Sequence, residues 1–328
     1  MLSCPTRVSN VSGLYFLADT IYCVITDKIK KFQHNLCNFA RKFEDTEKMK
    51  RLLFMLVAAV IPVAMSAQAQ ITTKKMKLED FPEKITKIVL SGNAFLDGEL
   101  KAGIKNHWTI SPYEFCTLDE FDRLKGSEDY YFLLTVLGQF RKEIEPGIEM
   151  LSLVKGGKGS DKNLDKMLEV VTIPLRSADY PSGRELIFLP AIIDIIQSHV
   201  LASMEKDIKG YSSLGQYCIN IAGADGMSII ISENDLAEQV GESFIESIKN
   251  ENFKVVCEEE ADEMMEAGAA NTLVSYTVAP YDAQNGSYCY KMLINARTHK
   301  LYYFRKHKIS RNAGSGFLPE DIIRIAGK

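Results

Sequence analysis

The sequence lacks the short patterns that mark the commonest metal and nucleophile sites of enzymes. It contains no HExxH, no pair of cysteines spaced CxxC, and no G-x-S-x-G string. These absences exclude the usual zinc-hydrolase helix, a cysteine zinc site of ordinary spacing, and a serine nucleophile on a strand-to-helix turn. From motifs alone we therefore predict no catalytic residue, no metal ligand and no cofactor.

Extremes of composition are also absent. Of 328 residues, 46% are hydrophobic and 25% are charged, which are ordinary values for folded globular proteins. This balance excludes a disordered tail, a collagen-like chain and a membrane protein with many spans. At about 100–200 residues per domain, the length favours two domains.

The pattern of an export leader lies at 49–69, inside the chain rather than at its start. The basic start 49–51 precedes the apolar run 52–65, and the A-x-A pattern of 67–69 follows. These are the three parts of a secretory signal peptide, and the run is short for a spanning helix, which needs about 20 residues. We predict a signal peptide at 49–69, cleaved after Ala69, and a periplasmic or secreted product. Its Met-Lys-Arg start and Ala-Gln-Ala-Gln end resemble signal peptides common in Bacteroidetes.

The 48 residues ahead of this leader need their own explanation. We interpret 1–48 as an upstream extension outside the mature protein, because signal peptides act at an N-terminus. The alternative makes 14–25 a membrane-associating helix, although this stretch contains Asp19 and is too short to span a bilayer. We expect no stable membrane span in the mature chain.

The chain without its first 69 residues is acidic. Those residues carry 9 basic and 5 acidic side chains, so the remainder has a formal net charge of −8. Proteins bind phosphate backbones through clustered positive charge, so we expect no nucleic-acid partner.

Four cysteines lie beyond the leader: Cys116, Cys218, Cys257 and Cys289. None has a neighbouring histidine, and all four lie in apolar or strand-like runs. Two interpretations stay open. The cysteines are small buried hydrophobic side chains, or they form one of the three pairings that four oxidised cysteines allow.

Two segments about 140 residues apart share one order of elements. The apolar runs 87–90 and 228–231 each end in Ser-x-Asn, which fits a buried strand followed by a capped helix. We predict that these helices end at the Ile-Lys-Asn of 104–106 and of 248–250, and that the second is one turn longer. Their apolar stripes are Leu96, Leu100 and Ile104 in the first copy and Leu236, Val240, Phe244 and Ile248 in the second.

In each copy, turn-forming residues between the later strand-like runs indicate a β-hairpin. The glycine-rich stretch 156–160 and the Asn-Gly pair 285–286 both separate strand-like runs. The unit is therefore β-α-β-α-β-β. We predict an α+β fold of two tandem modules, 70–180 and 226–328, each a mixed or antiparallel sheet with helices packed on one face.

Residues 181–225 are predicted to connect the modules through one apolar helix and a loop. Pro190 suits the first position of that helix, because its missing N–H has no partner there anyway. A short helix at 318–325 closes the chain. The apolar stripe of the connecting helix is Leu189, Ile192, Ile193, Ile196, Val200 and Ile208.

In element order, residues 86–175 and 226–310 resemble the N-terminal domain type of TolB, a small α/β module of bacterial envelope proteins. The resemblance covers the order of elements only. No diagnostic motif accompanies it, so it carries no functional residue to this chain.

The C-terminal hairpin contains the candidate binding residues. Tyr303, Arg305 and His307 alternate along the strand 301–309, so they would share one face. Tyr and Arg are favoured at binding hot spots, which makes this face a candidate surface for a protein or peptide. The alternative is a core-facing aromatic row with a basic solvent face.

The remaining histidines fit structural roles. His199 borders an apolar stripe and suits packing, His107 lies at a helix end, and His299 lies in a turn. Converging carboxylates in the largest pocket, or His199 placed beside Asp194 and a nucleophile, would favour an enzyme.

We therefore expect an exported, non-enzymatic envelope or secreted protein that acts as a protein-interaction module. The alternative is an exported hydrolase or small-ligand-binding protein with its site between the two modules, because pockets often form at domain interfaces. A third interpretation is a membrane-anchored protein that uses 14–25. The oligomeric state stays open.

The leader assignment makes a direct prediction. N-terminal mass spectrometry of the native protein should find a mature start at Gln70, because signal peptidase cleaves after the A-x-A pattern. Recovery of intact protein that retains residues 1–69 would contradict export by this route.

Overall fold

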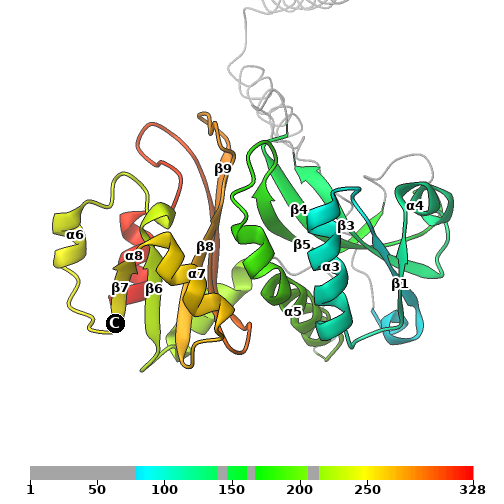
Figure 1. Cartoon of the computed structure of the whole chain (residues 1–328), viewed down its shortest axis with the longest axis horizontal. Helices are drawn as coiled ribbons and strands as arrows, with labels where there is room; N and C mark the ends of the chain where they lie inside the picture. The colour runs from blue at the N-terminus through cyan, green and yellow to red at the C-terminus, as the bar shows by residue number, and fades with distance from the viewer. Residues whose placement is uncertain (1–77, 139–145, 161–166, 206–213, 328) are drawn as a thin grey trace, which may run out of the picture. The chain divides into compact units, whose positions relative to one another are not determined.

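The structure is a computed structural model that describes residues 78–138, 146–160, 167–205 and 214–327. The leader, the upstream extension and the alternative helix at 14–25 lie outside these residues, and so does Ile208. Within the described part, the chain forms two five-stranded sheets accompanied by helices (Figure 1). The predicted α+β class with two tandem sheet modules is confirmed.

The first sheet has the strand order β2-β1-β3-β4-β5. Strand β1 runs parallel to β2 and β3, whereas β4 pairs antiparallel with β3 and β5. The strands are β1 (Ile85–Val89), β2 (Tyr113–Cys116), β3 (Tyr130–Gly138), β4 (Ile148–Lys155) and β5 (Leu168–Ser177).

The second sheet repeats this topology in the order β7-β6-β8-β9-β10. Strand β6 runs parallel to β7 and β8, and β9 pairs antiparallel with β8 and β10. The repeat inferred from the Ser-x-Asn runs is thus a repeat of the whole sheet. The strands are β6 (Ser228–Ser232), β7 (Phe253–Val256), β8 (Thr272–Val278), β9 (Tyr288–Asn295) and β10 (Leu301–Lys308).

Helices cover both faces of each sheet, not one as predicted. In the first module Ile88 packs in the cluster of α3, whereas its neighbour Val89 packs in the cluster of α4. In the second, Ile229 faces α6 and α8, whereas Ile230 faces α7. Parallel strands buried on both faces carry continuous apolar runs, as these do. The helices are α3 (Ala94–His107), α4 (Leu118–Leu124), α5 (Arg184–Glu205), α6 (Glu242–Glu246), α7 (Glu258–Glu266) and α8 (Pro319–Ala326), with 3-10 turns η2 (Phe81–Glu83), η4 (Leu214–Gly223) and η5 (Glu233–Asp235).

The helix predicted in the second copy, up to 248–250, is wrong. After β6 the chain forms the turn η5 and an extended stretch, and only 242–246 is α-helical. The backbone of 235–237 is used elsewhere: Phe317 N–H donates to Asp235 O (2.7 Å), and Ala237 N–H donates to Phe317 O (3.1 Å). This parallel bridge to the C-terminal segment replaces the first helical turn.

The helix α5 begins earlier than predicted, at Arg184, and Pro190 lies inside it. Proline at this position removes the N–H that would bond to the carbonyl of Leu186. Burial of a long apolar face offsets that loss, because the stripe residues from Leu189 to Val200 are fully buried.

Helix α5 contacts α3, β5 and α7, so it touches both modules (Figure 1). One apolar cluster is continuous from the first sheet through α5 to the second sheet. Among the described residues, α5 is the one helix long and apolar enough to cross a membrane, and 61% of its apolar window is buried. That burial is typical of the central helix of a folded core.

The four cysteines are free thiols in the structure, and Cys116 and Cys289 are buried. Burial raises the pKa of both thiols to about 11. These two therefore behave as small hydrophobic side chains, the first of the two interpretations.

The bridge that replaces the second-copy helix predicts a strict need for glycine at position 316. Gly316 has φ +105, and an added Cβ would lie 2.6 Å from Asp235 O and from the Leu236 carbonyl carbon. We expect Gly316→Ala to lower the free energy of unfolding by about 2 kcal/mol or more.

The matched control is Gly98→Ala on the exposed surface of α3, where an added Cβ meets nothing within 4 Å. This change should raise stability by about 0.5–1 kcal/mol, because alanine favours helix. Urea unfolding of both variants checks the pair. Equal effects would contradict the proposed bridge.

Candidate metal centre

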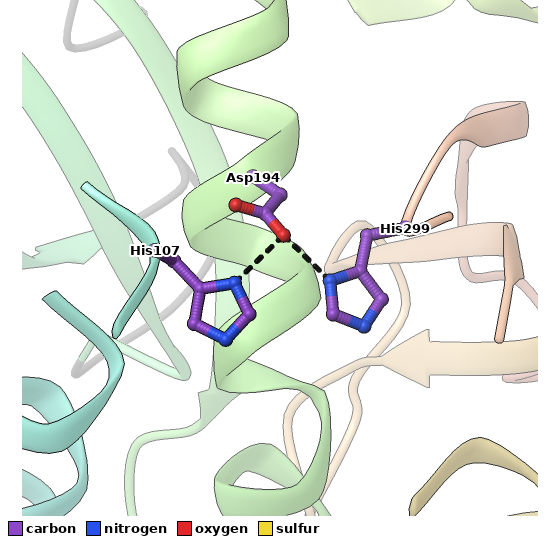
Figure 2. Close-up of side chains that lie close together, drawn as sticks. All are labelled: His107, Asp194 and His299. Carbon is purple, nitrogen blue, oxygen red and sulfur yellow. Dashed lines mark hydrogen bonds and ion pairs between the residues drawn. The ribbon is translucent and has the colours of Figure 1, made fainter. Parts of the chain in front are cut away.

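The side chains of His107 and His299, from distant parts of the sequence, meet the carboxylate of Asp194 in the middle of α5 (Figure 2). The Nδ1 atoms of His107 and His299 lie 2.9 Å and 2.6 Å from Oδ2 of Asp194. The ligand atoms of all three residues lie within 4.8 Å of one another. The two imidazole rings approach the same carboxylate oxygen from either side, one from each module.

His107 reaches this point because α3 ends there. Asn93 caps the start of α3 by accepting from the N–H groups of Phe95 and Leu96, as the Ser-x-Asn pattern predicts. The buried stripe then fixes the rotation of the helix against α5. His107 is the last helical residue, which places its ring beside Asp194.

His299 reaches the site from the turn between β9 and β10. Its φ is +55, in the left-handed region that residues other than glycine adopt rarely. Asn295 builds the turn: its Oδ1 accepts from the N–H of Arg297 (3.1 Å) and of Thr298 (2.9 Å). An unusual backbone held in place by its neighbours, with its side chain aimed at a shared carboxylate, is a common mark of a functional position.

Gln197 holds the carboxylate in orientation from the next turn of α5. Its Nε2 donates to Asp194 Oδ1 (3.0 Å) and to the carbonyl of His107 (2.8 Å). Its Oε1 accepts from the N–H of Thr109 (2.8 Å). Outer hydrogen bonds of this kind orient the ligands of metal sites.

The cluster is half-buried and electrostatically matched. The side chains of His107, Asp194 and His299 are 29%, 26% and 18% exposed. Burial alone would raise the pKa of Asp194, but hydrogen bonds from His299 and His107 outweigh it and hold that pKa below its usual range. Asp194 is therefore ionised at neutral pH and can only accept, so both Nδ1 atoms donate.

Two imidazole nitrogens and one carboxylate oxygen form a donor set suited to a divalent transition metal. Metal–ligand distances of about 2.0–2.2 Å would place the three atoms about 3.3 Å apart in a tetrahedral site. The two distances from Nδ1 to Asp194 Oδ2 would each increase by less than about 1 Å. A metal would then occupy the place of the two shared protons.

The predicted binding residues Tyr303, Arg305 and His307 do share one face, but that face packs inward. Tyr303 is fully buried, and its hydroxyl donates to Asp321 Oδ1 (2.6 Å). Arg305 donates to the same oxygen (3.0 Å), and His307 Nε2 bonds to the carbonyl of Gly314 (2.8 Å). Tyr303 is thus a buried side chain, whereas Arg305 and His307 beside it are partly exposed.

Asp321 is the centre of that buried network. It also accepts from the Lys291 ammonium and from the N–H of Leu318 (2.9 Å), which it caps at the start of α8. Burial alone would raise the pKa of Asp321, but the Lys291 charge and these bonds hold it below its usual range. The network fixes α8 on the second sheet.

His199 is not among the hydrogen-bond partners of Asp194 in the described part of the chain. Its Nδ1 bonds to the Tyr217 hydroxyl (3.0 Å) instead, across to η4. Burial lowers the pKa of His199 to about 4, so its ring is neutral and packed.

Sequence patterns do not identify this group of three side chains, because its members are far apart in the sequence. Asp194 is 87 residues from His107 and 105 from His299. The available signals were a histidine at a helix end, a histidine in a turn, and an aspartate in an otherwise apolar helix. None of them is specific without the fold.

Comparisons with protein-family models, with curated proteins and with solved structures find no match. The resemblance to the TolB N-terminal domain type therefore remains one of element order, and the site must be interpreted from its own geometry.

Burial of His199 predicts a pH dependence of stability. Its folded pKa of about 4 lies below the ordinary value of 6.5, so the unfolded chain binds more protons between these values. Stability from this residue is present above pH 6.5 and is lost as pH falls towards 4, by up to about 3 kcal/mol.

Urea unfolding at several pH values in the presence of a chelator measures this dependence. His199→Gln should flatten it, whereas Tyr217→Phe should leave it steep, because burial and not the hydroxyl lowers the pKa. Equal slopes in the wild type and His199→Gln would contradict the assignment.

Proposed function

We propose that this protein is a binding protein for a divalent transition-metal ion, held by His107, Asp194 and His299 at the junction of its two modules. The observation that carries the proposal is the convergence of two Nδ1 atoms on one Oδ2, at 2.9 Å and 2.6 Å. This is the small-ligand alternative with a site between the modules, now with a named ligand class.

The donor set selects the class of ion. Calcium and magnesium prefer shells of oxygen ligands, whereas imidazole suits zinc, copper, iron and nickel. Gln197 supplies the outer hydrogen bond that such sites use to orient a carboxylate. Three protein ligands also leave a coordination position for water or another molecule.

An interaction role in an exported protein is a second proposal. The observation that favours it is an exposed aromatic pair with one ring from each module. Tyr180 and Tyr281 are 63% and 67% exposed, and their ring centroids lie 4.6 Å apart. Exposed tyrosines are favoured in protein interfaces. Export itself remains a prediction from the leader.

Metal binding is testable by calorimetry and fluorescence. We expect Zn²⁺ to bind the metal-free protein with one ion per chain. Co²⁺ should quench the emission of Trp108, because this single tryptophan directly follows His107. Binding should weaken as the medium is acidified, since protons compete for the imidazole nitrogens.

Ligand variants decide where the ion binds. His107→Gln and His299→Gln should each weaken Zn²⁺ binding by more than the 10–100-fold that loss of an outer hydrogen bond typically causes, about 100-fold or more. His307→Gln, outside the cluster, should bind as the wild type does. Absence of Zn²⁺ binding by the wild type, or equal binding by all variants, would contradict the proposal.

A further inference from the structure

The second module is attached to α5 at two separate places. Arg184 at the first turn of α5 bonds to Asp235 (3.2 Å) and Asp262 (2.8 Å) of the second module. Asp194, ten residues further along α5, bonds to His299 of the same module. At a rise of 1.5 Å per residue, the two attachments lie about 15 Å apart along the helix.

The attachment at Arg184 is a buried ion-pair network. Arg184 is 6% exposed, and it also donates to the carbonyl of Ser275 (3.3 Å). Burial alone would lower its pKa, but the charges of Asp235 and Asp262 raise the pKa above its usual value. No physiological change of pH removes this charge.

Packed rings reinforce the same end. Phe188 of α5 stacks on Tyr276 of β8, with centroids 4.3 Å apart and planes 10° apart. The Arg184 guanidinium lies over both rings, and the Tyr276 hydroxyl donates to the carbonyl of Leu175 (2.6 Å). Breaking this end would leave a buried charge without its partners, which is strongly unfavourable.

The attachment at Asp194 is of a different kind. His107 and Asp194 both belong to helices that pack against each other, α3 and α5, whereas His299 belongs to the turn of the second module. Beside the shared apolar packing, the polar contact between Asp194 and the second module is one hydrogen bond between partly exposed groups. A bound ion would join His299 to one ligand on α3 and one on α5 by coordination bonds.

We infer that the metal acts as a clamp, which tightens the docking of the second module at the Asp194 end while the Arg184 end stays fixed. This inference rests on the proposed metal site and adds a role for the ion. The ion binds the docked form better than a form in which His299 has moved away, so it shifts the population towards docking. Coupling between sites of this kind is typically 5–150-fold.

The second sheet contains both a reporter and an internal control. Met292 on β9 is buried in the cluster that continues through α5, so it reports on docking. Tyr303 is equally buried but lies in the cluster under α8, on the opposite face of the sheet. Oxidative footprinting read by mass spectrometry measures the exposure of both side chains in one sample.

We expect saturating Zn²⁺ to slow oxidation of Met292 in the full chain at least about 5-fold, with no change at Tyr303. His307→Gln should respond like the wild type. His299→Gln should lose the response of Met292 to Zn²⁺, because the two remaining ligands lie on α3 and α5 and none lies on the second module.

Calorimetry on the same samples separates the two ideas. If Zn²⁺ binds to the wild type but leaves Met292 oxidation unchanged, the clamp is wrong and the metal site stands. If Zn²⁺ does not bind to the wild type, both are overturned. A response that persists in His299→Gln would also overturn the clamp.

Discussion

One carboxylate oxygen, Oδ2 of Asp194, accepts hydrogen bonds from a histidine of each module, and the proposed function depends on this sharing. The sharing requires a defined end for α3, which delivers His107, and a turn that holds His299 at positive φ. Gln197 occupies the other oxygen of the carboxylate, so Oδ2 is left for the two imidazoles. The fold therefore presents two nitrogens and one oxygen at one point, a donor set of the kind that binds transition metals.

Two other charged groups, Arg184 and Lys291, are more deeply buried and are paired with carboxylates. Arg184 is enclosed by acidic partners, and the Lys291 ammonium lies against Asp321 beneath α8. Such pairs are costly to break, because each partner would be left as an uncompensated buried charge, so they hold the fold. The cluster at Asp194 is partly exposed, and its two imidazoles are ligands of the kind that transition metals prefer. This contrast is why we assign the ligand site to Asp194 and a structural role to the buried pairs.

Much of the architecture is predictable from local patterns. Apolar runs, Ser-x-Asn caps and turn signals at 156–160 and 285–286 are local features, and they predict the two tandem sheets. The prediction of a helix in the second copy is wrong because the backbone of 235–237 bonds to Phe317. This partner lies about 80 residues away, outside any local stretch of sequence. The helix start predicted from Pro190 is wrong, because burial of α5 outweighs the one backbone hydrogen bond that the proline removes. The candidate site is missed for the same reason as the helix, because its residues meet only when α3 and the β9–β10 turn both pack against α5.

The most direct test of the central claim is a crystal structure of the protein soaked with Zn²⁺, with anomalous diffraction recorded at the zinc edge. The proposed site requires a single strong anomalous peak about 2.0–2.2 Å from His107 Nδ1, Asp194 Oδ2 and His299 Nδ1. A map in which this position holds no peak, while the three side chains keep their mutual hydrogen bonds, would contradict it.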